Sequence, residues 1–244
     1  MIVRTNQKAA DFNSAVANIR YNVINAVYQN KFSFAGVFCQ ILDNETTANI
    51  CFLDGNFTVC ASDNADFQEI TSFLKMQGAV TIFAAKNTAQ KLGITINSTF
   101  STLILKRDKL PNNMQKTAGD KEHFRDAYNI LAADKSGNIS MPDFNSWYSD
   151  FCIRYNHGYA QYTVKNGCAA IAGFVFEDSA LITGIAVPTE KQGQGFGTSI
   201  LESLETKLYN AKEIYVCTNE NTSVFYEKNG FSKYGEYCIG DYNE

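Results

Sequence analysis

The sequence predicts an α/β protein of two domains, in which the C-terminal domain has a mixed, largely antiparallel sheet flanked by helices. Apolar residues at helical spacing alternate with short β-branched runs along the whole chain. The 244 residues also exceed the usual size of one domain. Residues 107–120 are polar and include a proline, which is typical of a linker. The expected domains are therefore residues 1–110 and 120–244.

The composition is that of a soluble globular protein. It is 45% hydrophobic and 13% aromatic, and the net charge of −4 provides no basic surface for nucleic acid. No apolar run has the length of a membrane span, and the first residues lack the apolar region of a signal peptide. We expect a cytoplasmic protein without nucleic-acid or membrane partners, and the oligomeric state stays open.

Cysteine and histidine usage argues against disulfides and metal sites. The seven cysteines are odd in number, mostly lie in apolar strand-like runs, and form no Cys-x-x-Cys pair. We interpret them as reduced core residues. With only two histidines, a zinc site would need an unusual set of ligands, so no metal is expected.

The sequence of the N-terminal half predicts one helix followed by three strands. A helix, a strand, a second helix and a last strand are expected after them. Helical spacing covers residues 9–28, and the pair Asp54-Gly55 predicts a tight hairpin turn. Strands are expected at residues 35–42, 48–53, 57–61, 79–84 and 99–106, and helices at residues 65–77 and 87–92. Gly78 and Gly93 are expected to end these two helices.

Two helices open the C-terminal half, at residues 124–132 and 142–155. The polar segment between them resembles a calcium loop, but Ala132 and Asp143 would occupy its first and last ligand positions, so a simple turn is favoured. Pro142 then fits the first position of the second helix. The aromatic residues of that helix suit either the core or the wall of a substrate pocket: Phe144, Trp147, Tyr148 and Phe151. His157 fits a helix end better than a catalytic base.

Three antiparallel strands are expected next, followed by a glycine-rich loop. The strands are residues 159–164, 168–176 and 180–187, and Asn166-Gly167 is a strong hairpin signal. The loop contains Gly193, Gly195 and Gly197 and leads into a helix. Such a junction exposes backbone N–H groups and the positive end of a helix dipole, which favours phosphate or pyrophosphate. A tight strand-to-helix connection is the alternative.

Two motifs resemble those of the GNAT acetyltransferase superfamily. The loop fits the acetyl-CoA pattern Arg/Gln-x-x-Gly-x-Gly/Ala through Gln192, Gly195 and Gly197. A second segment, Asn219 to Phe231, fits the pattern Asn-x-x-Ala-x-x-x-Tyr-Glu-Lys-x-Gly-Phe, with Thr222 where alanine is usual. The likeness covers roughly residues 120–240.

The resemblance implies acetyl-CoA as co-substrate and assigns roles to particular residues. The backbone of Ile185, Ala186 and Val187 would bind the pantetheine arm. The remaining cofactor-binding residues implied are Gln192, Gly193, Gln194, Gly195, Phe196, Gly197, Thr198 and Asn219. Tyr226 would be the catalytic acid that protonates the leaving thiolate, unless its ring only packs beside Phe225. The base is not identifiable: Glu177, Glu190, the helix near Tyr148 and a water relay are equal candidates.

The N-terminal half has the same expected element order as residues 168–239. Lys91-Leu92-Gly93-Ile94 falls where Lys228 to Phe231 falls in the second half. A degenerate GNAT-like copy and an unrelated α/β domain are both open. The segment corresponding to the phosphate loop has no glycine and contains Asp63 and Asp66, so we expect no CoA there.

The function that follows is an acetyl-CoA-dependent N-acetyltransferase. No Gly-x-Ser-x-Gly motif or neighbouring Cys–His pair offers a covalent nucleophile, so direct transfer to the primary amine of a small molecule or peptide is expected. Alternatives are a non-catalytic acyl-CoA-binding or sensory protein, and an interaction protein whose N-terminal domain recruits a partner. The identity of the acceptor stays open. Whether the donor carries an acetyl group or a longer acyl group also stays open.

Overall fold

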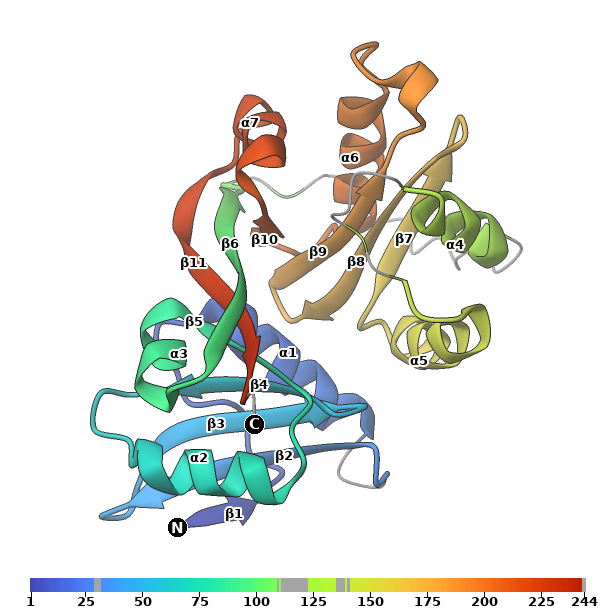
Figure 1. Ribbon diagram of the computed structural model, residues 1–244. Coiled ribbons are helices and arrows are strands. Elements are labelled where there is room, and N and C mark those ends of the chain that lie inside the picture. The colour runs from blue at the N-terminus through green and yellow to red at the C-terminus, as the bar shows by residue number, and fades with distance from the viewer. Residues whose placement is uncertain (29–31, 109, 111–122, 135–138, 140, 243–244) are drawn as a thin grey trace. The chain divides into compact units, whose positions relative to one another are not determined.

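The computed structural model describes residues 1–28, 32–108, 110, 123–134, 139 and 141–242 (Figure 1). The chain forms two compact units, Met1–Thr102 with Tyr234–Glu244, and Leu103–Lys233. The first unit therefore includes the C-terminal residues, which a division at the linker would assign to the second half. Most of residues 107–120 and of the calcium-like turn lie outside the described residues.

The first unit is a sheet with α1 on one face and α2 and α3 on the other (Figure 1). Its antiparallel strands lead to β5, which is parallel to β4 and antiparallel to β11 (Ser232–Asp241). The elements are β1 (Ile2–Arg4), α1 (Ala15–Tyr28), β2 (Ala35–Leu42), β3 (Glu45–Leu53), β4 (Asn56–Ala61), α2 (Phe67–Met76), β5 (Thr81–Ala85), α3 (Lys86–Leu92) and β6 (Thr95–Lys106).

Local sequence accounts for most boundaries of this unit. Asp54 and Gly55 both have positive φ angles, 49° and 75°, as a two-residue hairpin turn requires. Helix α2 begins at Phe67 because Asp66 accepts a hydrogen bond from the Glu69 N–H group and caps the helix. Helix α1 begins at Ala15, later than predicted, and the N–H group of Ala9 instead donates to Asn22 Oδ1.

The second unit contains the predicted strand–loop–helix junction. Its elements are α4 (Phe124–Ala132), α5 (Phe144–Asn156), β7 (Gln161–Lys165), β8 (Cys168–Phe176), β9 (Ser179–Ala186), the short 3-10 helix η2 (Thr189–Lys191), α6 (Phe196–Lys207), β10 (Glu213–Thr218), α7 (Glu220–Lys228) and β11 (Ser232–Asp241). Strands β7, β8 and β9 are antiparallel, and β10 is parallel to β9.

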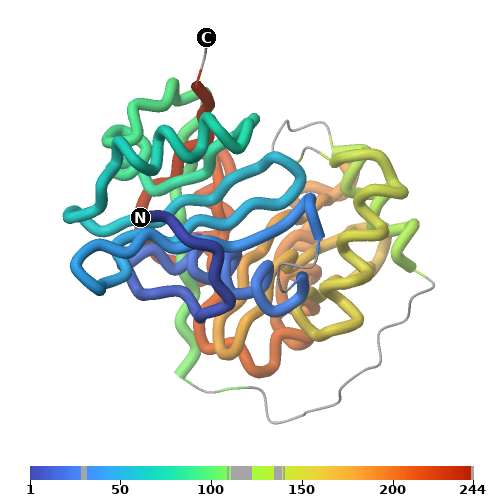
Figure 2. Tube along the Cα trace, turned by 90° about the horizontal axis from the view of Figure 1, so that it is seen from below, coloured from blue at the N-terminus to red at the C-terminus, as the bar shows by residue number. Residues whose placement is uncertain are grey.

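Helices cover both faces of this sheet. Helices α4 and α5, which lie side by side in Figures 1 and 2, pack an aromatic core that includes Phe124, Trp147 and Phe151 against β7 and β8. Helix α6 packs Ile200, Leu201 and Leu204 into a second apolar core, together with residues of β8, β9 and β10. The predicted mixed, largely antiparallel sheet flanked by helices is confirmed.

The order strand–strand–strand–helix–strand–helix–strand occurs twice, in β2 to β6 and in β7 to β11. The strand directions repeat as well, because β4 and β5 are parallel in the first copy and β9 and β10 in the second. The last strand is divided between the units: its residues 237–240 pair with β5 in the first one.

Two expectations of the second unit were wrong. Pro142 is not the first residue of α5, because Asp143 is the N-cap and accepts hydrogen bonds from the N–H groups of Asn145 and Ser146. Arg107 is not a linker residue. Its guanidinium donates to the carbonyls of Glu205, Leu208 and Ala211 at the end of α6. A cation is favourable there because it satisfies the last carbonyls of a helix.

The cysteines are all free, as expected, and five of the seven are buried: Cys39, Cys51, Cys60, Cys168 and Cys238. None of the described helices combines the length and the apolar character needed to cross a membrane.

Candidate functional site

Strands β9 and β10 separate at one end of the second unit. Their parallel pairing ends at Ile182 and Val216, although β9 continues to Ala186 and β10 to Thr218. The backbone of β9 after Ile182 is therefore not paired with β10. An extended ligand can take the place of the missing strand through main-chain hydrogen bonds.

The residues predicted to bind the pantetheine arm lie at this separation. Ile185 and Ala186 are the last two residues of β9 and pair with Ala170 and Ala169 of β8 on the other side. Val187 follows directly. A bulge at Thr183, which the sequence analysis missed, begins the unpaired part of β9.

The glycine-rich loop ends in an exposed helix N-terminus. The N–H groups of Lys191 and Gln192 bond inside the 3-10 turn, and the first internal bond of α6 runs from the Ser199 N–H group to the Gly195 carbonyl at 3.0 Å. The N–H groups of Phe196, Gly197 and Thr198 therefore have no acceptor inside the helix. Together with the helix dipole, these donors favour the approach of an anion.

Side chains of the loop hold its shape. Gln192 Nε2 donates to the Val187 carbonyl at 3.1 Å, and Gln194 Nε2 donates to the Glu190 carbonyl at 2.7 Å. The first contact ties the loop to the end of β9. Both side-chain amides thus bond to the protein's own backbone, and contact of Gln192 or Gln194 with a cofactor stays a prediction.

The three loop glycines do not share one role. Gly193 and Gly195 have φ angles of 74° and 84°, a left-handed region that side chains disfavour, and a Cβ added to either would meet nothing within 4 Å. A Cβ on Gly197 would instead lie 2.9 Å from Cε2 of Phe225. Packing against α7 thus requires a glycine at position 197, and contact of the three loop glycines with a cofactor stays a prediction.

Asn219 is the N-cap of α7. Its Oδ1 atom accepts the Thr222 N–H group at 3.1 Å and the Thr222 hydroxyl at 3.0 Å. Thr222, which departs from the usual alanine, thus strengthens the cap of this helix. Contact between Asn219 and a cofactor stays a prediction.

Tyr226 lies on α7 with its ring between two others. It makes edge contacts with Phe225 and Phe231, at centroid distances of 5.0 Å and 5.4 Å, and only 7% of the residue is exposed. Burial raises the pKa of its phenol above the ordinary value. Within the described part of the chain, the hydroxyl has no hydrogen-bond partner and is not one of the fully enclosed atoms that lack one. Its hydrogen-bonding capacity is therefore not used by the described residues.

The residues considered as a base are not brought together into an acid–base pair. Glu177 lies in an exposed turn, and Glu190 is exposed in the 3-10 helix η2. Tyr148 is 39% exposed, and a hydrogen bond to Cys152 raises its pKa. His157 ends α5, where its Nδ1 atom is 2.8 Å from the Ile153 carbonyl. Among the described residues, no three side chains of metal-ligand type are grouped.

Comparisons with known proteins agree with this geometry. Residues 150–233 match the family described as Acetyltransferase (GNAT) domain. By sequence, no curated protein matches the chain.

Solved structures match over nearly the full length. A GCN5-related N-acetyltransferase from Kribbella flavida has a TM-score of 0.60 at 10% identity, covering 97% of this chain and 98% of that one. One from Sphaerobacter thermophilus has a TM-score of 0.60 at 12% identity, covering 98% and 94%. A tandem GNAT protein from the clavulanic acid biosynthesis pathway, without AcCoA, has a TM-score of 0.54 at 10% identity, covering 98% and 97%. At such identities the likeness shows a shared fold.

The family match, with the shared fold of these neighbours, supports an acyltransferase. Residues 150–233 are a GNAT acetyltransferase domain. The resemblance inferred from Gln192, Gly195 and Gly197 is thereby confirmed at the level of the family.

Proposed function

We propose that this protein transfers an acetyl group from acetyl-CoA directly to a primary amine. The observation that carries the proposal is the continuity between two features: the unpaired backbone of β9 after Ile182, and the exposed helix N-terminus at Phe196. The first suits the amide groups of a pantetheine arm, and the second suits a pyrophosphate. A cytoplasmic location is part of the proposal and rests on the sequence alone.

The chemistry is a single displacement at the thioester carbonyl. The amine attacks the carbonyl carbon, and N–H groups of β9 near Val187 stabilise the oxyanion. The C–S bond then breaks, and the Tyr226 hydroxyl gives its proton to the thiolate. The phenol carries its proton at neutral pH, and the pKa raised by burial makes it a weaker acid than an exposed tyrosine. The tyrosinate recovers a proton from the amine nitrogen through solvent.

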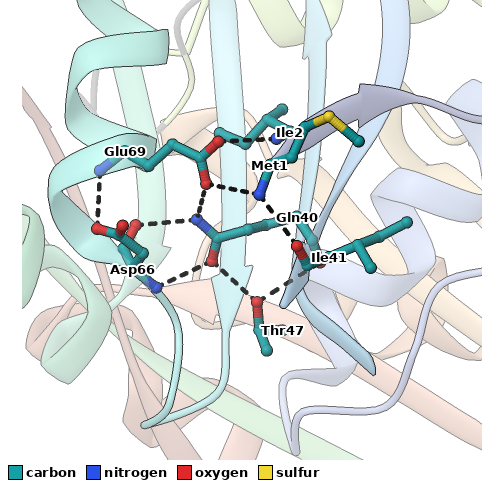
Figure 3. A network of polar contacts seen from close by, with 7 residues as sticks. All are labelled: Met1, Ile2, Gln40, Ile41, Thr47, Asp66 and Glu69. Atoms are coloured by element: carbon teal, nitrogen blue, oxygen red, sulfur yellow. Dashed lines mark hydrogen bonds and ion pairs between the residues drawn. The ribbon is translucent and has the colours of Figure 1, made fainter. Parts of the chain in front are cut away.

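The proposal includes the first unit as a degenerate copy of the same fold, and this copy does not bind CoA. At the start of α2, the Asp66 carboxylate accepts the Glu69 N–H group, and Gln40 Oε1 accepts the Asp66 N–H group, both at 3.0 Å (Figure 3). Gln40 Nε2 also donates to Glu69 Oε2 at 2.7 Å, and Thr47 donates to Gln40. The protein's own oxygens thus occupy the N–H groups of Asp66 and Glu69, and the two carboxylates at this helix start would repel an anion.

The experiment is a screen of small amines and peptides with detection of the released CoA thiol, combined with calorimetry of acetyl-CoA binding to the whole chain. We expect turnover with at least one amine and a stoichiometry of one. A stoichiometry of two would contradict the closed first unit. Tight binding without turnover on any amine would favour the sensory alternative.

A further inference from the structure

An ion pair whose arginine is buried and whose aspartate is partly exposed lies on α5, outside both sequence motifs. Arg154 is 6% exposed and binds Asp150, one helical turn earlier, through two parallel contacts: Nε lies 3.3 Å from Oδ1, and Nη2 bonds to Oδ2. The guanidinium carbon is also 4.6 Å from the ring centroid of Phe174. Burying a charged pair is costly and rarely stabilises a fold more than apolar packing would. The cost of burying the Arg154 charge therefore points to a specific role for the pair.

The remaining contact of the guanidinium reaches an irregular point of the sheet. Arg154 Nη1 donates to the carbonyl of Gly173. Gly173 has no partner in the register of β8 and β9, because Ala172 pairs with Ile182 and Phe174 with Leu181. Arg154 thus satisfies the carbonyl of a residue that the ladder skips.

Gly173 also brings this contact next to the bulge in β9. A Cβ added to Gly173 would lie 2.7 Å from Thr183 Oγ1 and 3.4 Å from Arg154 Nη1. Only glycine leaves room for both groups. Thr183 is the skipped residue of β9, and it comes directly after Ile182, the last residue of β9 that pairs with β10.

We propose that Arg154 is a positioning residue for acyl transfer, which holds the Gly173–Thr183 irregularity and thereby directs the backbone of residues 183–186 away from β10. Asp150 fixes the plane of the guanidinium, so that Nη1 points at the Gly173 carbonyl. The inference rests on the proposed function, because those residues are the ones assigned to the pantetheine arm and the oxyanion. The phosphate loop, by contrast, is held by contacts outside residues 183–186: Gln192 donates to the Val187 carbonyl just after β9, and Gln194 donates to the Glu190 carbonyl.

The test compares two ligands on the full chain. Acetyl-CoA needs both the phosphate loop and the β9 backbone, whereas adenosine 3′-phosphate 5′-diphosphate, the part of CoA without the pantetheine arm, needs only the loop. For Arg154→Met we expect acetyl-CoA affinity to fall about tenfold, the equivalent of roughly one lost hydrogen bond. The affinity for the nucleotide should stay within about twofold of wild type. The kcat should fall by about 10²-fold, as expected for a small misplacement of reacting groups.

Arg125→Met is the matched control, because Arg125 is exposed on α4 and rests on the ring of Phe144. It removes the same charge from the same unit and should leave both affinities and kcat unchanged. In Arg154→Lys, the lysine can bond to the Asp150 carboxylate or the Gly173 carbonyl but not to both. Acetyl-CoA affinity and kcat should therefore fall less than in Arg154→Met, and the affinity for the nucleotide should again be kept. If Arg154→Met does not fold, Arg154→Lys tests the positioning role in its place.

Two results would overturn the inference: equal losses for both ligands, which indicate a general structural defect, or unchanged acetyl-CoA affinity and kcat. A wild-type protein that binds neither ligand would instead overturn the proposed function itself.

Discussion

Gly197, in the first turn of α6, packs directly against the ring of Phe225 on α7. A Cβ on Gly197 would lie 2.9 Å from Phe225 Cε2 and 3.4 Å from Cζ, closer than side chains tolerate. The helix that follows the phosphate loop therefore touches the helix that carries Tyr226. The glycine couples the two motifs through packing.

The first prediction concerns this contact. Gly197→Val should lower the free energy of unfolding by about 1–3 kcal/mol, because added methyl groups force a packed ring to move. Urea unfolding measures the change. In a Phe225→Ala background the same substitution should cost at least about 1 kcal/mol less, which a double-mutant cycle detects. Gly235→Val is the control, since a Cβ there meets nothing within 4 Å. Additive effects of Gly197→Val and Phe225→Ala would contradict the contact.

The elements that sequence predicts best are those set by neighbouring residues. The hairpin pairs Asp54-Gly55 and Asn166-Gly167 adopt the positive φ angles that such turns require. The bounds of β2, β8 and α4 agree with the sequence prediction to the residue. The phosphate loop also depends on local chemistry, and its glycines at 193 and 195 identified it.

What the sequence did not predict depends on residues far apart in the chain. Arg107 acts on carbonyls about a hundred positions away. The role of Gly197 needs the ring of Phe225, and the bulge at Thr183 needs Gly173 and Arg154. No pattern within a short window records such contacts, because each partner alone fits an ordinary helix or strand.

The second prediction tests the phosphate loop. Saturating acetyl-CoA should raise the melting temperature of wild type by about 5 °C or more, as a ligand that binds only the folded state must. Gly195→Glu should abolish the shift, because the carboxylate blocks the helix N-terminus and repels pyrophosphate. Gly195→Gln is the matched control, with the same strain at φ 84° but no charge. It should retain part of the shift. A normal shift in the glutamate variant would place the cofactor elsewhere.

The third prediction concerns the C-terminal strand in the first unit. Tyr237 is 3% exposed, and its hydroxyl accepts the Ala17 N–H group at 2.9 Å and bonds to Ser14. Tyr237→Phe should lower the free energy of unfolding by about 1–3 kcal/mol, because it leaves buried polar groups unpaired. Tyr234→Phe, at a 41% exposed position on the same strand, should change it by less than about 0.5 kcal/mol. Equal effects in thermal or urea unfolding would contradict this assignment.

The fourth prediction concerns thiol reactivity. Burial raises the pKa values of Cys51 and Cys60 to about 12, so at pH 8 the reactive thiolate is scarce in the folded state. Half-buried Cys152 and Cys217 should therefore be alkylated first when native protein is pulsed with iodoacetamide. Mass spectrometry of the peptides gives the order. In urea all four should react alike, and equal labelling without urea would show that the first unit opens readily.

The last prediction separates an enzyme from a binding protein, and it concerns Tyr226. If its hydroxyl protonates the departing thiolate, Tyr226→Phe keeps the ring contacts with Phe225 and Phe231 but removes the proton donor. The kcat should then fall by about 10²-fold or more, while acetyl-CoA affinity stays unchanged. A ring that is only structural would give turnover within a few-fold of wild type. Phe231→Leu is the control for packing, because it disturbs the same ring cluster without touching the hydroxyl. It should lower stability and leave kcat nearly unchanged, so that a loss of kcat confined to Tyr226→Phe identifies the acid.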